Sequence, residues 1–200
     1  MIGRLVVATS NTGKLREFAA ALKGATGVVE PLPAGVSLPA ETGGTFMANA
    51  LQKAVCAAEA TEMPALADDS GLSVDALGGA PGVRSARFAG PGATDADNCA
   101  LLLERLRGVP ETRRQARFIA ALALVWPDGR TLTAVGECAG SILPAPRGSG
   151  GFGYDPLFYY PPLRRTFAEL TLEQKNRVSH RAAALAQLRD RLSAASGRVL

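Results

Sequence analysis

Residues 4–18 read RLVVATSNTGKLREF, a β-branched apolar run followed by a polar turn and a charged, helix-forming segment. The apolar run predicts a strand, and residues 10–13 supply turn and N-cap chemistry for a helix that opens at Lys14 and ends near Gly24. A strand that passes into a helix through a short turn is a building unit of α/β proteins, so this stretch indicates that fold class.

Later segments add further strands and helices and one hairpin. The Asp128-Gly129 pair between two long apolar runs is a strong hairpin signal. Thr45 and Thr94 are expected to cap helices, and Asp97 completes a capping box with Thr94. The sequence therefore predicts an α/β fold around a mixed sheet. The expected strands are 4–9, 28–32, 65–67, 72–74, 114–126 and 132–143, with an acidic turn at 68–71, loops at 33–44 and 144–153, and a C-terminal helix with the stripe Val178, Ala182, Leu185, Leu188 and Leu192.

The composition is that of an ordinary globular chain. With 200 residues, 47% of them hydrophobic, the chain can bury a core as one domain, residues 1–200, without a disulfide or a metal. Cys56, Cys99 and Cys138 form no CxxC pair, which indicates a reducing compartment and argues against a zinc site. The amino end lacks a signal-peptide pattern, and the apolar stretch 118–126 is about half of the ~20 residues that a membrane helix needs. We expect a cytoplasmic protein with no membrane partner.

The charge balance favours a small anionic partner. The chain has 22 basic and 18 acidic residues, a formal net charge of +4, and these residues are spread along the sequence. Polymeric nucleic acid needs a clustered basic face with interleaved aromatic residues, but only 6% of the residues are aromatic. A nucleotide suits the same sign of charge, and we expect no nucleic-acid polymer as a partner.

The turn Ser10-Asn11-Thr12-Gly13-Lys14 is a candidate phosphate site. It lies where a strand passes into a helix, so backbone N–H groups and the helix dipole suit phosphate, and Lys14 adds a point charge. The turn is not a Walker A loop, which needs GxxxxGK followed by Ser or Thr. A simple helix cap is the alternative interpretation.

Asp68 and Asp69 are a candidate acidic site at the end of a strand. Adjacent side chains of an extended chain point to opposite faces, so one carboxylate is expected to enter a given cavity and the other to have a supporting role. Mg²⁺ takes carboxylate, phosphate and water oxygens, and Glu41, in the loop ahead of the helix that carries Lys53, offers a second carboxylate. A solvated acidic turn is the alternative.

The C-terminal third carries a group of donors around the single histidine. His180 lies between Ser179 and Arg181, close behind Lys175 and Asn176. A lone histidine is more often structural, but lysine, histidine and arginine together also suit carbonyl or phosphate oxygens. The loop 150–156 adds an aromatic ring that could stack on a base, an acid that could accept ring N–H bonds, and glycines that allow close approach. The sequence disfavours serine hydrolase chemistry, because no GxSxG elbow is present and the single histidine lies among cations.

Taken in order, these segments resemble the inosine triphosphate pyrophosphatase family, the non-standard purine nucleoside triphosphate pyrophosphatases. The resemblance runs nearly from end to end, and the ordered set of motifs is far more specific than any one of them. Its residues are Thr9-Ser10-Asn11-Thr12-Gly13-Lys14, Glu41-Thr42-Gly43, Thr45-Phe46, Asn49-Ala50, Lys53-Ala54, Ala67-Asp68-Asp69-Ser70-Gly71-Leu72, Pro81-Gly82, Ser85-Ala86-Arg87-Phe88, Gly151-Phe152-Gly153-Tyr154-Asp155-Pro156, Lys175-Asn176 and Ser179-His180-Arg181.

The resemblance implies that the protein hydrolyses ITP, dITP and XTP to the monophosphate and pyrophosphate with Mg²⁺ as cofactor. This reaction would clear deaminated purines from the nucleotide pool. The resemblance also implies that the protein is a homodimer. It also implies an elongated, two-lobed α/β domain around a long mixed sheet, with the active site in the cleft between the lobes. Glu41 and Asp69 would hold the metal, and Asp69 would also be the general base. The residues that would bind substrate are Thr9, Ser10, Asn11, Thr12, Gly13, Lys14, Lys53 and Ser70 and, toward the base, Phe152, Gly153, Tyr154, Asp155, Lys175, His180 and Arg181.

Three other functions compete with this one. A related pyrophosphatase would act on modified pyrimidine or methylated nucleotides. A binding module without turnover would explain the positive charge and the glycine-rich loops, but it leaves Glu41 and Asp69 without a role, because carboxylates repel a phosphate backbone unless a cation intervenes. A structural or interaction protein would place large apolar residues at its distinctive positions.

Overall fold

The computed structural model describes residues 2–23 and 26–196, with side chains up to residue 194. Among them, seven strands form one sheet in the order β2-β1-β3-β4-β5-β6-β7. β1 pairs in parallel with β2 and β3, whereas β6 pairs antiparallel with β5 and β7, so the sheet is mixed as predicted. The strands are β1 (Arg4–Val7), β2 (Val28–Pro31), β3 (Ala65–Val74), β4 (Gln115–Val125), β5 (Thr131–Ile142), β6 (Phe158–Tyr160) and β7 (Arg165–Thr166), and the α-helices are α1 (Thr12–Ala21), α2 (Phe46–Thr61), α3 (Asp95–Arg105), α4 (Leu172–Val178) and α5 (His180–Ser196).

The chain divides into two compact units. Unit 1 comprises Met1–Asp69, Ala120–Gly136 and Arg181–Leu200, so far as these residues are described, and unit 2 comprises Ser70–Ile119 and Glu137–His180. Three strands, β3, β4 and β5, begin in one unit and end in the other.

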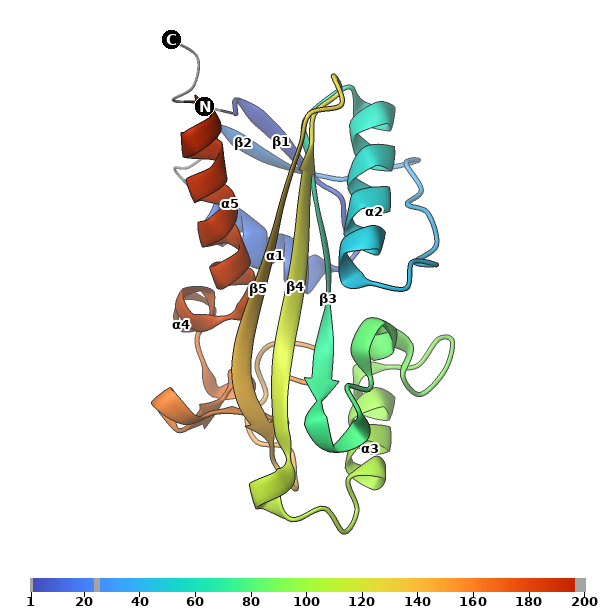
Figure 1. The fold of residues 1–200 in the computed structure, drawn as a ribbon, viewed down its shortest axis with the longest axis vertical. Coiled ribbons are helices and arrows are strands. Elements are labelled where there is room, and N and C mark those ends of the chain that lie inside the picture. Colours follow the sequence, from blue (N-terminus) through green and yellow to red (C-terminus); the bar gives the residue numbers. More distant parts are fainter. Residues whose placement is uncertain (1, 24–25, 197–200) are drawn as a thin grey trace. The chain divides into compact units, whose positions relative to one another are not determined.

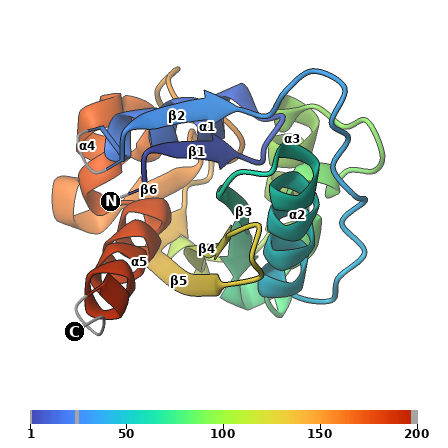
Figure 2. The same cartoon turned by 90° about the horizontal axis from the view of Figure 1, so that it is seen from above.

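Unit 1 has helices on both faces of its strands. Figures 1 and 2 show α2 along one face of these strands and α5 along the other. Strand residues alternate strictly between the two faces, because successive side chains of a strand point in opposite directions. The strand residues that face α2 are small, whereas those that face α1 and α5 are larger. Because α2 also presents alanines to the sheet, this helix packs close to the strands. The α2 side includes Val6, Ala65, Ala67, Ala121 and Ala123 with Ala50, Ala54, Ala57 and Ala58 of α2, and the other side includes Leu5, Val7, Leu66, Leu122 and Leu124 with Phe18, Leu185 and Leu188.

Unit 2 is built around an aromatic core. The rings of Phe118, Phe158 and Phe167 pack with centroids 4.6 to 5.7 Å apart, and His180 stacks on Phe118 at 4.8 Å. Burial raises the pKa of the Cys138 thiol to about 12, as expected for a cysteine that serves as a small apolar residue. All three cysteines are free thiols.

Local signals predicted most of the boundaries. Asn11 caps α1, Thr45 caps α2, and Thr94 forms the expected capping box with Asp97 at the start of α3. β4 and β5 are neighbours joined by the turn at Asp128, so the hairpin is confirmed. The expected end of the first helix near Gly24 lies outside the described residues. No helix in the described part of the chain combines the length and apolar character needed to cross a membrane.

Two predictions were wrong. The acidic turn at 68–71 does not exist, because β3 continues as one strand of 10 residues through Asp68 and Asp69. Both carboxylates have cationic partners, so the strand can bury them without turning outward. Val178 does not belong to the stripe of the C-terminal helix, since it ends α4 and packs against the core of unit 2. β6, β7 and α4 were not predicted as separate elements.

The tight alanine face of α2 generates a stability prediction. Ala57 is fully buried in that face, so Ala57→Leu should destabilise the protein by about 1–3 kcal/mol through overpacking. Ala60→Leu, the same change at an exposed position of the same helix, should have little effect. Urea unfolding of both variants measures the difference, and equal stabilities would contradict this description of the layer.

Candidate active site

The turn between β1 and α1 has the geometry of a helix N-terminus that can receive an anion. The Asn11 Oδ1 accepts from the Lys14 backbone N–H at 3.0 Å, and the Asn11 N–H donates to Thr9 Oγ1 at 3.1 Å. Ser10 and Thr12 are exposed beside this cap. Because α1 runs for 10 residues, its dipole adds positive potential at the turn.

Asp68 is directed to the α1 and α5 side of the sheet, where cations surround it. The Lys14 Nζ lies 2.7 Å from Asp68 Oδ2, and the Arg181 Nε lies 3.4 Å from the same oxygen. The Arg181 Nη1 also pairs with Glu17 Oε2 at 2.9 Å. Burial lowers the pKa of Lys14, and the charge of Asp68 works against this effect. These four residues form a chain of alternating charges, Glu17–Arg181–Asp68–Lys14, in which all but the partly exposed Lys14 are buried, and we call it the Asp68 cluster.

Asp69 is directed to the opposite side, toward α2. Its Oδ2 accepts from Asn49 Nδ2 at 2.9 Å, and its Oδ1 lies 3.1 Å from Lys53 Nζ. The same ammonium lies 2.7 Å from Glu41 Oε1. Glu41, Asn49, Lys53 and Asp69 form the Asp69 cluster, and the expectation that the two aspartates point to opposite faces is confirmed.

The two carboxyl groups of the Asp69 cluster have pKa values shifted in opposite directions. Burial raises the pKa of Asp69, and the charge of Lys53 and the Asn49 hydrogen bond offset this only in part. Burial also acts to raise the pKa of Glu41, but the hydrogen bond and charge of Lys53 outweigh it and lower that pKa. Burial opposes the charged form of Lys53, yet its two carboxylate partners raise its pKa. A carboxylate with a raised pKa beside one with a lowered pKa is a pattern of acid–base sites.

The Asp69 cluster suits a hard divalent cation. The carboxylates of Glu41 and Asp69 both pair with the ammonium of Lys53, so the three side chains together carry a net charge of −1. Within residues 2–23 and 26–196, no group of three or more histidine, cysteine or acidic side chains gathers as a metal site. Two carboxylates alone match an ion such as Mg²⁺ that completes its shell with water and substrate phosphate oxygens.

A separate polar group lies in unit 2. The Lys175 Nζ donates to Asp155 Oδ2 at 2.5 Å and lies 4.5 Å from the centre of the Phe152 ring. The Phe152 backbone N–H donates to the same carboxylate oxygen at 2.9 Å. The loop before Asp155 needs glycine at residue 151, because a Cβ there would lie 2.1 Å from Asp155 Oδ2. The loop and α4 therefore hold an acid, a cation and a partly exposed ring together.

The expected site residues fall into these groups with some differences. Tyr154 is buried, and its hydroxyl donates to the Ser85 carbonyl at 2.9 Å, which is a structural contact. His180 is buried against Phe118 in unit 2. Arg181, the next residue, belongs to the Asp68 cluster with Lys14, whereas Lys175 and Asp155 lie in unit 2. Ser70 follows Asp69 on β3.

Sequence reasoning gave no role to two residues that the structure places in these clusters. Asn49 binds Asp69, and Glu17 binds Arg181. The spacing of Asn49 and Lys53, one turn apart on α2, was a usable signal for the first. Glu17 had no comparable signal, because its partner is 164 positions away in the chain.

The fold and these clusters define a mixed-sheet α/β protein with a paired-carboxylate and lysine centre beside a helix N-terminus. The chain belongs to the Ham1 family, whose model matches residues 5–191. A dITP/XTP pyrophosphatase of Geobacter sulfurreducens is 54% identical over 191 residues, which cover 94% of this chain and 96% of the relative.

Solved structures agree with this assignment. A HAM1 protein from Coxiella burnetii superposes with a TM-score of 0.85 at 43% identity, covering 96% of this chain and 99% of that one. The Ham1 protein of Staphylococcus aureus superposes with a TM-score of 0.82 at 38% identity, covering 96% and 98%. The α/β fold expected from the sequence is therefore confirmed.

The buried pair of Glu17 and Arg181 generates a stability prediction. Removing one partner of a buried ion pair leaves an uncompensated charge, so Glu17→Gln should destabilise the protein by about 3–5 kcal/mol. The matched change Glu30→Gln, in the solvent-exposed pair with Arg4, should lower the stability far less. Urea unfolding distinguishes the two, and a Glu17 variant as stable as the Glu30 variant would contradict the role of this pair.

Proposed function

We propose that this protein hydrolyses non-standard purine nucleoside triphosphates, such as ITP, dITP and XTP, to the monophosphate and pyrophosphate in a Mg²⁺-dependent reaction. The observation that carries the proposal is the Asp69 cluster, in which a buried carboxyl with a raised pKa lies beside Glu41 and Lys53. Membership in the Ham1 family and the similarity to the dITP/XTP pyrophosphatase of Geobacter sulfurreducens support it.

Glu41 and Asp69 would hold the Mg²⁺ ion, which when bound supplies positive charge to the phosphate oxygens. The chain's own groups add to this charge. Lys14 and Lys53 would bind nonbridging phosphate oxygens, and the N-terminus of α1, from Thr9 to Gly13, would receive a phosphate through its backbone N–H groups. Ser70, next to Asp69, would complete the substrate contacts on β3.

The reaction proceeds by attack of water on the α-phosphorus. The oxygen of the water forms a bond to this phosphorus, the bond from it to the α,β-bridging oxygen breaks, and pyrophosphate leaves. The proton lost by the water would pass to a carboxylate oxygen of Asp69. Asn49 and Lys53 hold the two oxygens of that carboxyl group in place meanwhile.

The polar group of unit 2 would select the base. The ammonium of Lys175 offers only donors, which suit the 6-keto oxygen of hypoxanthine or xanthine. Adenine presents an amino donor at that position, so it would leave the lysine donor unsatisfied. Phe152 would stack on the base, and Asp155 and the Gly153 and Tyr154 backbone would line its edge. The expected roles of His180 and Arg181 toward the base gain no support, because His180 is buried against Phe118 and Arg181 pairs with Glu17 and Asp68.

We further propose that residues 1–200 act as one domain. Two copies of the chain would form a homodimer, and the protein would work in the cytoplasm. The family model crosses both units without interruption, which supports the single domain. The three free thiols suit a reducing compartment.

A substrate panel tests the function. ITP, dITP, XTP, ATP, GTP, a modified pyrimidine triphosphate and a methylated purine triphosphate are incubated with the protein with and without Mg²⁺, and phosphate is measured with and without added inorganic pyrophosphatase. ITP and XTP should be cleaved far faster than ATP, and cleavage should require Mg²⁺. Phosphate should appear only when inorganic pyrophosphatase is added, because the product is pyrophosphate. Preferential cleavage of modified pyrimidine or methylated nucleotides would contradict the substrate class. Binding of nucleotides without any cleavage would contradict the enzyme.

Asp69→Asn tests the proton acceptor. The variant keeps the shape of the side chain but cannot take a proton, so ITP turnover should fall by at least about a hundredfold while the fold is retained. Asp75→Asn, the same change at an exposed aspartate just after β3, is the control and should retain full turnover. Near-normal turnover of the Asp69 variant would remove this residue from the mechanism.

A further inference from the structure

Asn49 connects the loop that carries Glu41 to the strand that carries Asp69. Its side chain is 1% exposed, its Nδ2 donates to Asp69 Oδ2 at 2.9 Å, and its Oδ1 accepts from the Gly43 backbone N–H at 2.7 Å. A carboxamide both donates and accepts, which a carboxylate or an ammonium cannot do. One buried side chain therefore fixes two parts of the Asp69 cluster against each other.

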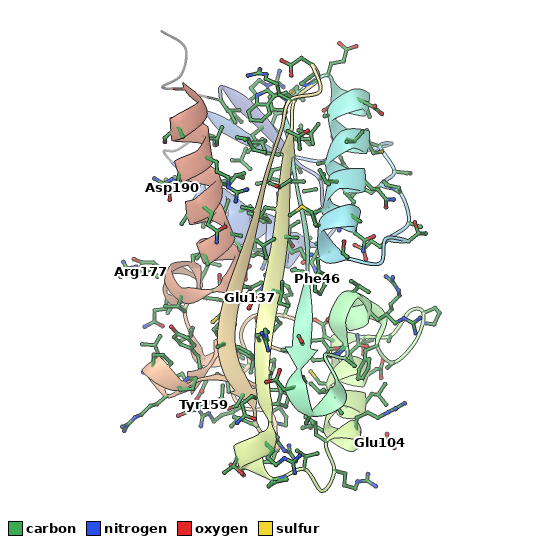
Figure 3. All side chains as sticks on the ribbon, viewed as in Figure 1. Phe46, Glu104, Glu137, Tyr159, Arg177 and Asp190 are labelled. Atoms are coloured by element: carbon green, nitrogen blue, oxygen red, sulfur yellow. The ribbon has the colours of Figure 1, made fainter. Side chains whose placement is uncertain are left out.

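Lys53 makes a parallel connection one helical turn later. Its ammonium joins Asp69 Oδ1 at 3.1 Å and Glu41 Oε1 at 2.7 Å. The first turns of α2 thus hold the Asp69 carboxylate by both oxygens, and they hold the Glu41 loop at Gly43 and at the Glu41 side chain. Phe46, the first residue of α2, marks this end of the helix in Figure 3.

Gly43 allows the loop to come this close to Asn49. A Cβ at this position would lie 2.6 Å from Asn49 Oδ1 and 2.9 Å from the Ala48 Cβ, so a side chain would force the two parts apart. Gly43 does not have a positive φ, so close approach and not backbone conformation explains the glycine. The adjacent Gly44 differs, because a Cβ there would meet nothing within 4 Å.

We propose that Gly43 and Asn49 are positioning residues that set the spacing of Glu41 and Asp69 and thereby the affinity of this pair for a divalent cation. The inference rests on the proposed function, in which these two carboxylates hold the ion. Side chains that hydrogen-bond to metal ligands fix the orientation of those ligands, and their loss commonly weakens metal binding.

Two alanine variants of neighbouring glycines test the proposal. The dissociation constant of Mn²⁺, used alone as a paramagnetic probe without nucleotide, is measured for the wild type, Gly43→Ala and Gly44→Ala. Gly43→Ala should weaken Mn²⁺ binding by about 10–100-fold, while Gly44→Ala should bind as the wild type does. Asn49→Ala should match Gly43→Ala, with Gln52→Ala, an exposed amide on the same helix, as its control.

Turnover gives a second readout. If spacing is the defect, the loss of kcat with ITP in Gly43→Ala should shrink as the Mg²⁺ concentration rises, which a general loss of structure would not do. Thermal unfolding checks the fold of each variant. If Asn49→Ala does not fold, Gly43→Ala decides the question, because it retains every polar group of the cluster.

Three results would overturn the proposal: equal Mn²⁺ affinities of wild type and Gly43→Ala, equal weakening in both glycine variants, or no Mn²⁺ binding by the wild type. A wild-type protein that binds Mn²⁺ but cleaves no triphosphate would instead contradict the proposed function. In that case the Mn²⁺ comparison between the glycine variants still supports or overturns the positioning role.

Discussion

Two adjacent carboxylates buried on one strand constrain the whole of unit 1. Asp68 is 2% and Asp69 is 4% exposed, and burying an unpaired carboxylate costs several kcal/mol. Each therefore needs a cation, but strand geometry sends the two side chains to opposite faces. The cations must come from both sides of the sheet: Lys14 of α1 and Arg181 of α5 on one, and Lys53 of α2 on the other.

This constraint explains why the helices carry their charges where they do. Lys53 lies on the alanine-rich face of α2, which also carries the buried Asn49, and it is buried because it pairs with two carboxylates. Glu17 lies on the buried face of α1 beside Phe18, and it balances Arg181. The Asp68 cluster thus links the start of α1 to β3, while the Asp69 cluster retains a net negative charge that suits a cation.

Sequence patterns predicted the features that depend on near neighbours. The opposite directions of Asp68 and Asp69 follow from strand geometry, and the caps at Asn11, Thr45 and Thr94 follow from local hydrogen bonding. Sequence patterns gave a wrong prediction where residues distant in the chain determine the local structure. Two aspartates followed by Ser-Gly are typical of a turn, and only cations far away in the chain make a continuous strand possible. The placement of Arg181 beside Glu17 and Asp68 depends in the same way on how α1 and α5 pack.

In the proposed reaction, the Asp69 cluster directs water to the α-phosphorus of a nucleoside triphosphate. Hydrolysis of ITP in ¹⁸O-labelled water, with mass spectrometry of both products, tests this claim most directly. Attack at the α-phosphorus places one labelled oxygen in the monophosphate and none in pyrophosphate. Label in pyrophosphate, or release of labelled orthophosphate with a diphosphate product, would show attack at another phosphorus and would contradict the account.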